Sequence, residues 1–226
     1  MEQLARELAR GLDARTTVRI TAVTREEDGW RAEDEDERTY HARALVLTAP
    51  APQSLALLDT GGTSLADEDR AALGKIAYEP CLTGIFEVNS DVGLPAPGAI
   101  QRPQANVSWV ADNHRKGISP DAVVLTVQAS PTYSRQLWEL SDERILSALR
   151  VDLMPFIRDS SNIREAQLKR WRYSLPSVLH PDRCLLAAGL PPLAFAGDAF
   201  KEPRVEGAVL SGLAAGAAVA DKLAAG

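Results

Sequence analysis

The segment FAGDAFKEPRVEGAVLSGLAAGAAVADKL, residues 195–223, decides the fold because it combines three local patterns. An apolar run at 193–196 stops at Gly197-Asp198, and small and aliphatic residues then recur at helical spacing over about 207–223. This order predicts a strand, a turn and a helix. Gly197 would let the backbone pass close to another group, and Asp198 would place a carboxylate at the carboxyl end of the strand.

The predicted helix start suits an anionic ligand. Gly207 and Ala208 would open the helix with free N–H groups at the positive end of its dipole. A strand end that carries a carboxylate, followed by a helix start of this kind, fits the hydroxyls and anionic oxygens of a nucleotide. The same residues also fit a structural role, in which Gly, Ala and Ser allow close packing on a sheet and Asp198 only caps the turn.

The full pattern resembles the C-terminal signature of the FAD-dependent amine oxidase superfamily, in which an A-G-D-like strand end precedes a loop and an E-G-A-like helix start. The resemblance implies that the aspartate meets the ribityl and pyrophosphate part of FAD and that the helix N-terminus faces the pyrimidine oxygens of the flavin. The cofactor-binding residues implied in this part of the chain are Gly197, Asp198, Glu206, Gly207 and Ala208.

The N-terminal part resembles another portion of the same FAD-binding domain. The patterns predict an amphipathic helix ended by Gly11-Leu12, a strand, a polar hairpin arm and an apolar strand, at residues 1–12, 16–25, 30–42 and 44–50. By resemblance, Ile20 sits over the adenine, and Ala49-Pro50 is where the chain leaves the FAD domain. The acidic run 33–37 is interpreted as a solvated hairpin tip rather than a metal site, because consecutive strand residues point to opposite faces.

The middle of the chain has a different organisation. Helices are predicted at 65–73 and 141–157, the second one stopped near Pro155. Strands are predicted at 78–88, 105–112, 122–130 and 166–176, and a Pro/Gly-rich loop at 91–103. Together with these patterns, the resemblance implies the fold class α/β plus α+β: an incomplete FAD-binding Rossmann-like domain with an inserted antiparallel-sheet substrate domain. The expected bounds are 1–58 and 191–226 for the FAD-binding parts and 59–190 for the substrate domain.

Within the superfamily the chain is most similar to bacterial renalase-like NAD(P)/FAD-dependent oxidoreductases, through SWVADNHRKGIS at 108–119 and KRWRYSLP at 169–176. The resemblance implies a substrate cavity walled by Trp171 and Tyr173, with Trp109 and Asn113 at its lip. From spacing alone, a half-buried strand with aromatic packing is the favoured interpretation of Trp171 and Tyr173, and a hairpin with a polar turn is the structural alternative for Trp109 and Asn113.

The resemblance implies hydride transfer to FAD from a reduced, nitrogen-containing small molecule. Flavin chemistry needs no protein nucleophile, so no catalytic residue is assigned. Many amine oxidases carry a lysine near the flavin N5 on the strand matching 78–88, but here the nearest lysine is Lys75. This difference favours renalase-like substrates, which are dihydronicotinamide dinucleotides.

The superfamily's G-x-G-x-x-G turn has no match in the sequence, and Gly61-Gly62 lacks both the preceding strand and the third glycine. We interpret the chain as a truncated member that binds FAD weakly or not at all by itself. A second chain or a missing N-terminal segment would complete the FAD site. The alternative is a catalytically inactive remnant or interaction module without bound flavin.

Composition predicts a cytoplasmic protein without nucleic-acid or membrane partners. Hydrophobic residues make up 45% and charged residues 25%, the net charge is −6, and no apolar run approaches the ~20 residues of a membrane span. Cys81 and Cys184 are expected to be free buried thiols. The histidines His41, His114 and His180 lie far apart in the sequence, so no metal site is expected.

Overall fold

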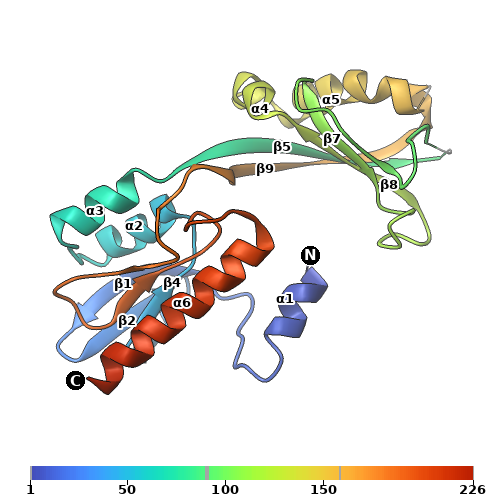
Figure 1. The fold of residues 1–226 in the computed structure, drawn as a ribbon. Helices are drawn as coiled ribbons and strands as arrows, with labels where there is room; N and C mark the ends of the chain where they lie inside the picture. Colours follow the sequence, from blue (N-terminus) through green and yellow to red (C-terminus); the bar gives the residue numbers. More distant parts are fainter. Residues whose placement is uncertain (1, 90–91, 158, 226) are drawn as a thin grey trace. The chain divides into compact units, whose positions relative to one another are not determined.

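The computed structural model describes residues 2–89, 92–157 and 159–225, and the chain forms two compact units (Figure 1). The first unit combines the residues up to Ile76 with those from Val178 onward, and the second comprises Ala77–Ser177. Each unit has its own sheet system and is described by itself.

The first unit holds two small sheets. Strands β1 (Ile20–Glu26), β2 (Gly29–Asp34) and β3 (Thr39–Ala42) form an antiparallel meander. Strands β10 (Leu185–Leu186), β11 (Leu193–Phe195) and β4 (Leu45–Leu47) form the second sheet, in the order β10-β11-β4. Because β11 runs parallel to β4, the C-terminal segment is built into the N-terminal one (Figure 1).

Four helices are described in this unit: α1 (Glu2–Leu8), α2 (Ala51–Thr60), α3 (Asp67–Gly74) and α6 (Arg204–Ala224). Helix α2 packs on β1, α3 packs on α2, and α6 packs on β4, β10 and β11. The expected domain changes after residues 58 and 190 therefore fall inside this unit. Packing of α3 on α2 extends its first part to Ile76, and the pairing of β10 with β11 extends its second part back to Val178.

One buried aromatic residue joins the meander to the second sheet. The Trp30 side chain is 2% exposed, and its indole Nε1 donates to Pro192 O at 3.1 Å. The same carbonyl accepts the Leu45 N–H at 2.9 Å. Residues far apart in the sequence thus share one acceptor just before β11, which fixes where that strand begins.

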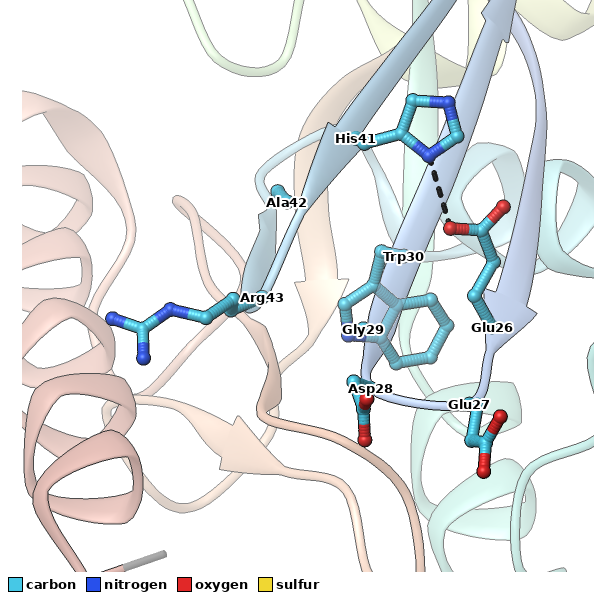
Figure 2. Close-up of a pocket in the computed structure, with 8 residues that line it drawn as sticks. All are labelled: Glu26, Glu27, Asp28, Gly29, Trp30, His41, Ala42 and Arg43. Carbon is cyan, nitrogen blue, oxygen red and sulfur yellow. Dashed lines mark hydrogen bonds and ion pairs between the residues drawn. The ribbon is translucent and has the colours of Figure 1, made fainter.

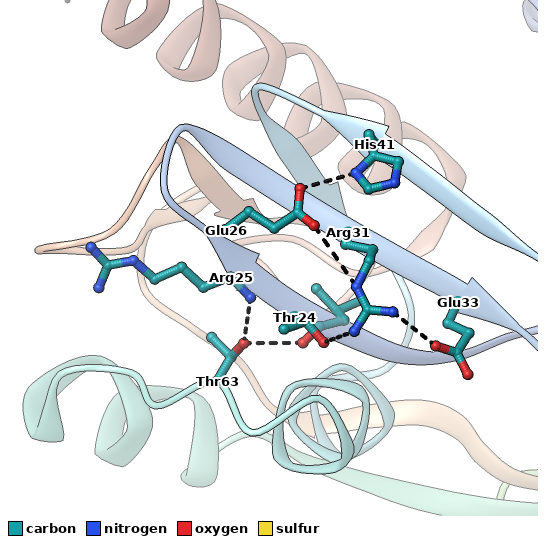
Figure 3. A network of polar contacts seen from close by, with 8 residues as sticks. Thr24, Arg25, Glu26, Arg31, Glu33, His41 and Thr63 are labelled. Carbon is teal, nitrogen blue, oxygen red and sulfur yellow. Dashed lines mark hydrogen bonds and ion pairs between the residues drawn. The ribbon is translucent and has the colours of Figure 1, made fainter.

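A polar network attaches the α2–α3 connection to β1 (Figure 3). The Thr63 hydroxyl donates to Val23 O at 3.1 Å and accepts the Arg25 N–H at 3.0 Å. On the meander, Arg31 lies between Glu26 and Glu33. The buried Thr63 satisfies backbone groups of β1 that have no strand partner on that side.

The acidic hairpin tip is only partly solvated, contrary to expectation. Asp34 is 4% exposed, and its carboxylate accepts the Tyr40 hydroxyl at 2.8 Å and the backbone N–H groups of Asp36 and Arg38 at 3.0 and 2.9 Å. Burial alone raises the pKa of Asp34, but these donors outweigh it and hold that pKa below its usual value. Asp34 therefore organises the turn, while Glu35 and Glu37 stay exposed.

Helix α1 ends at Leu8, earlier than the predicted stop at Gly11-Leu12, and the chain continues through turns. The leucines of this N-terminal segment are uncovered within the first unit: Leu4 and Leu8 of α1 are 46% and 55% exposed, and Leu12, beyond the helix, is 71% exposed.

Helix α6 is long and apolar enough to cross a membrane by length and composition, which the sequence analysis did not expect. Core helices pass the same test, so a single such helix is weak evidence for a span. One stripe of α6, made of Gly207, Ser211, Ala215 and Val219, is buried. The opposite side is open, and Leu213 is 66% exposed.

The second unit is a five-stranded sheet in the order β6-β7-β8-β5-β9, with helices packed on one side of its core. Its strands are β5 (Ala77–Val88), β6 (Ala99–Gln101), β7 (Val107–Asp112), β8 (Val123–Ala129) and β9 (Ile163–Val178), and its helices are α4 (Pro131–Leu137), α5 (Asp142–Ile157) and the short η1 (Ser160–Asn162). Helix α5 packs on β5, β7 and β8, and α4 packs on β5.

Two details of the second unit differ from the sequence-based expectation, and a third agrees with it. Helix α4 was not predicted; it begins at Pro131, and the side chain of the capping residue Ser130 accepts the Tyr133 N–H. Strand β6 lies inside the expected loop 91–103, of which residue 91 is outside the described residues. Helix α5 agrees with the predicted helix at 141–157 and ends at Ile157, two residues after Pro155, where Phe156 and Ile157 are buried in the core.

Candidate functional site

The carboxyl ends of β4 and β11 lie at the same edge of their sheet, because the two strands are parallel. A cavity of about 440 Å³ opens at this edge and is lined by Thr48, Gly197, Asp198, Arg204, Val205 and Ala208. Thr48 follows β4, Gly197 and Asp198 follow β11, and the others belong to the first turns of α6. The predicted residues Gly197, Asp198 and Ala208 are therefore brought together around one cavity.

Gly197 has a backbone role at this edge. Its φ of 138° lies in a region that side-chain-bearing residues rarely adopt. Its N–H donates to Ser211 Oγ at 2.9 Å, so this donor is used inside the protein. Gly197 thus fixes the path of the chain between strand and helix.

Asp198 is half-buried in the same cavity wall. Burial raises the pKa of its carboxyl, and a backbone hydrogen bond opposes part of that effect. Within the described part of the chain, no ion pair to Asp198 is found. A carboxylate partly removed from water without a cationic partner can accept hydrogen bonds from ligand hydroxyls.

The start of α6 corrects the predicted roles of Gly207 and Ala208. The helix begins at Arg204, after Pro203. By helix geometry, the N–H groups left free belong to Arg204, Val205 and Glu206 instead of Gly207 and Ala208. Val205 and Arg204 line the cavity, so the positive end of the helix still faces it.

Gly207 and Glu206 do not line the cavity. Gly207 is buried, and a Cβ atom built on it would lie 1.9 Å from Glu202 O, so the glycine permits the close return of the loop onto the helix. The Glu206 side chain is exposed to solvent. The contacts of Gly207 thus support the structural role, in which a small residue allows close packing.

The loop between Asp198 and α6 is strained. Lys201 has a φ of 66° and Arg204 a φ of 79°, and neither is a glycine. Left-handed backbone costs about 1–2 kcal/mol per residue for L-amino acids. Such strain persists only where the surroundings over-determine it, and it concentrates at ligand-binding segments. Arg204 was missed by the sequence analysis, since hydrophobic periodicity gives no signal for it.

Ile20 lies at a neighbouring cavity of about 400 Å³, lined by Arg19, Ile20, Thr21 and Ala49 together with residues of α2. Thr48 lines the first cavity and Ala49 the second, so the two cavities flank the exit of the chain from β4. Ile20 therefore shares a cavity with Ala49, the residue where the chain was predicted to leave the FAD domain. Asp198 lines the other cavity, together with Thr48.

In the second unit, Tyr173 lines a cavity of about 420 Å³ with Tyr78, Pro80, Arg135, Trp138, Glu139 and Arg172. The rings of Tyr78 and Tyr173 pack edge to face with centroids 5.6 Å apart. The Arg172 guanidinium lies over the Trp138 ring at 5.3 Å. Arg172 and Tyr173 point to opposite faces of β9, but both reach the cavity because β9 is an edge strand.

The other predicted cavity residues lie elsewhere. Trp171 is 55% exposed and does not line this cavity. Trp109 is half-buried on β7, opposite Gln128. The Asn113 side-chain amide donates to Thr126 Oγ1 at 3.0 Å, which is the hairpin role that spacing alone also allowed.

A further cavity of about 420 Å³ lies at the β1–β2 turn and contains none of the predicted residues (Figure 2). Glu26 is directed at His41, whose Nδ1 lies 2.9 Å from its carboxylate, while Arg43 points away. These side chains are exposed, and such ion pairs are worth little.

Neither a metal cluster nor a disulfide is found among the residues that the structure describes. No group of three or more His, Cys, Asp or Glu side chains could hold an ion there. Both cysteines are free; Cys81 is buried as expected, whereas Cys184 is half-buried. Burial raises the pKa of the Cys81 thiol, which keeps it in its unreactive form.

Solved structures share the fold of this chain at low sequence identity. A putrescine oxidase with redesigned cofactor binding aligns with a TM-score of 0.68 and 17% identity, covering 98% of this chain and 53% of that one. A fatty acid isomerase from P. acnes that produces CLA aligns with a TM-score of 0.62 and 18% identity, covering 94% and 51%.

Sequence comparison identifies the family. Polyamine oxidase 4 of Oryza sativa subsp. japonica is 27% identical over 231 residues, which cover 92% of this chain and 45% of the relative. The chain therefore spans about half the length of the relatives it matches. The family model of flavin-containing amine oxidoreductases matches residues 1–220, and the chain belongs to that family, whose cofactor is the FAD expected from the sequence.

Proposed function

We propose that this chain contributes the substrate domain and part of the cofactor site of a FAD-dependent oxidoreductase. That part, the cofactor edge, is the sheet edge that carries Asp198 and Arg204. The observation that carries the proposal is the cavity at the carboxyl ends of β4 and β11, where Asp198, Arg204 and the first turn of α6 meet. A half-buried carboxylate, a cation and free helix N–H groups match the hydroxyls and anionic oxygens of a dinucleotide.

The residues around this edge fit FAD in part. Asp198 would accept hydrogen bonds from cofactor hydroxyls, and Arg204 with the N–H of Val205 would hold an anionic oxygen. Ile20, at the adjoining cavity, would contact the adenine. In this proposal the first unit is an incomplete Rossmann-like domain and the second unit is an inserted substrate domain. When bound, FAD supplies the acceptor for the hydride.

Uncovered apolar surface supports the proposal that another stretch of polypeptide completes the first unit. Leu4, Leu8 and Leu12 of the N-terminal segment and Leu213 of α6 are each at least 46% exposed. A second chain or an additional segment of the same protein, packed on these residues, would supply the remaining cofactor contacts. Exposed apolar patches of this kind mark interaction surfaces.

For the substrate we propose a dihydronicotinamide rather than a polyamine. Strand β5 carries no lysine, and Lys75 lies just before it. The cavity of Tyr173 and Trp138 offers aromatic faces for a planar ring. Its lining carries Arg172, Arg135, which is ion-paired with Glu79, and one carboxylate, Glu139; this excess of cations suits an anionic dinucleotide more than a cationic amine. Polyamines and putrescine are the competing class, because relatives carry those names.

Flavin titration separates this proposal from an inactive remnant or interaction module without flavin. FAD is titrated into the chain supplied with the segment that completes its first unit, and into the same protein carrying Asp198→Ala, with a thermal melt of each. Loss of hydrogen bonds to a charged acceptor, about 1.5–3 kcal/mol each, predicts about one to two powers of ten weaker binding. A lowered melting temperature with unchanged affinity would make Asp198 a structural residue, and the absence of any flavin binding would favour the remnant.

The substrate class is tested with the flavin-loaded protein under anaerobic conditions. Reduced nicotinamide dinucleotides are expected to bleach the flavin absorbance band, whereas putrescine and spermidine leave it unchanged. Bleaching by the amines alone would reverse the assignment. The Tyr173→Ala variant should lose bleaching rate while keeping bound flavin, because Tyr173 lies in the other unit from Asp198.

A further inference from the structure

His180 is a buried histidine that lies in the first unit, outside the cavity of Asp198. It is 8% exposed and follows β9, in the connection to β10. The backbone N–H of His180 donates to Ala199 O at 2.8 Å, and its carbonyl accepts the Lys201 N–H at 2.7 Å. His180 thus forms an isolated parallel bridge with Phe200, in the middle of the loop that leads to α6.

The side chain adds a second attachment to the same loop. The imidazole packs against the Phe200 ring with centroids 5.3 Å apart. Its Nδ1 accepts the Asp182 backbone N–H at 3.1 Å. This acceptor role fixes the ring orientation against Phe200, which is itself 3% exposed.

The loop that His180 holds is the strained one. Lys201, with a φ of 66°, donates its backbone N–H to the His180 carbonyl, and Arg204, with a φ of 79°, follows three residues later. Two left-handed non-glycine residues within four positions need external contacts to persist. An exposed ion pair of Arg183 with Glu202, at 3.7 Å, is the weaker tie between the two segments.

We propose that His180 is a positioning residue for the cofactor edge: through Phe200 and Lys201 it holds the loop in the strained conformation that keeps Asp198 and Arg204 on one cavity wall. This inference rests on the proposed function only for the identity of the ligand. A group held in place before binding spares the ligand the free energy of ordering the loop.

The test uses three substitutions in the 226-residue chain. His180→Ala removes the ring contact with Phe200 and the acceptor for the Asp182 N–H, while the backbone bonds to Ala199 and Lys201 remain. His180→Asn restores the acceptor for Asp182, since asparagine commonly accepts the N–H two residues on, but it lacks the ring contact. Val219→Ala is the matched control, because it truncates a buried residue of α6 that packs on the same sheet without touching the loop.

Amide hydrogen exchange without ligand is the first readout. His180→Ala is expected to speed exchange in 199–204 by at least tenfold while the later turns of α6 stay protected, and His180→Asn is expected to recover part of that protection. Val219→Ala should speed exchange mainly in α6. Unchanged exchange in 199–204, or an equal increase throughout the first unit, would overturn the positioning role.

FAD affinity, measured well below the melting temperature, is the second readout. His180→Ala should weaken FAD binding about tenfold. Val219→Ala should leave the affinity unchanged even if its melting temperature falls as much as that of His180→Ala. If the unaltered protein, with the completing segment present, binds no FAD but the exchange pattern is as expected, the proposed cofactor fails and the positioning role stands. Equal loss of affinity in both variants would make His180 merely structural.

Discussion

Ser211 Oγ accepts the Gly197 N–H at 2.9 Å, and this bond joins the end of β11 to the second turn of α6. Ser211 is fully buried in the stripe of α6 that packs on the sheet. The small-residue character of this helix therefore includes one specific polar contact, and the Gly197 N–H is excluded from cofactor binding by its protein partner.

Ser211→Ala should destabilise the first unit by about 1–3 kcal/mol, because the Gly197 N–H would lose its partner in a partly buried position. Urea denaturation measures the change. Ser64→Ala is the control: Ser64 is exposed, and its replacement should change stability by less than about 0.5 kcal/mol. Equal effects of the two substitutions would show that the Ser211 bond is unimportant.

Asp198→Asn should make the unliganded chain more stable at neutral pH. Burial raises the pKa of Asp198 in the folded state, so the folded chain holds this proton more tightly than the unfolded chain does. Stability therefore falls as pH rises from the unfolded value of about 3.9 through the raised folded value. Asparagine cannot ionise, so the gain is expected at pH 7 and should vanish near pH 3.

Urea midpoints of the Asp198→Asn chain and the unaltered chain at several pH values test this expectation. Asp28→Asn, at an exposed position in the β1–β2 turn, serves as control and should give a small difference at every pH. If Asp198→Asn instead lowers stability at neutral pH, the carboxylate is a favourable cap of the turn, which is the structural alternative for Asp198 given in the sequence analysis.

Tyr40→Phe should destabilise the β2–β3 hairpin in a pH-dependent manner. The hydroxyl of Tyr40 helps to hold the pKa of Asp34 below its usual value against the effect of burial. The stabilisation is present above about pH 3.9 and is lost as pH falls through the lowered folded pKa. The melting temperatures of the two proteins should converge in acid, whereas a constant difference from pH 7 downward would contradict the assigned interaction.

The strand, turn and helix of residues 193–224 were predictable from sequence because their signals are local. Apolar clustering, glycine and helical spacing are each read from neighbouring residues. The start of α6 was misplaced by three residues, since Pro203 and the left-handed Arg204 determine it and neither carries a periodic signal. Arg204 was missed as a cavity residue for the same reason.

The cavity around Tyr173 could not have been assembled from sequence. Tyr78, Trp138 and Arg172 come from β5, the end of α4 and β9, and only the sheet order places them together. Similarly, the burial of Asp34 within an acidic run depends on Tyr40, six residues away across a turn. Composition describes such a run as solvated on average, while a single side chain in it organises the turn.

The two helix glycines Gly207 and Gly212 provide the final prediction, because they have the same helical setting and opposite surroundings. A Cβ on Gly207 would lie 1.9 Å from Glu202 O, a backbone atom that cannot turn aside, whereas a Cβ on Gly212 would have nothing within 4 Å. Gly207→Ala should therefore cost about 1–3 kcal/mol or more by overpacking, and it should displace the loop that carries Arg204. Gly212→Ala should stabilise the helix by about 0.5–1 kcal/mol, since alanine favours helix interiors over glycine. Urea denaturation of both variants measures the two signs in one experiment. Stabilisation by both substitutions would mean that the loop does not return onto α6 at Glu202.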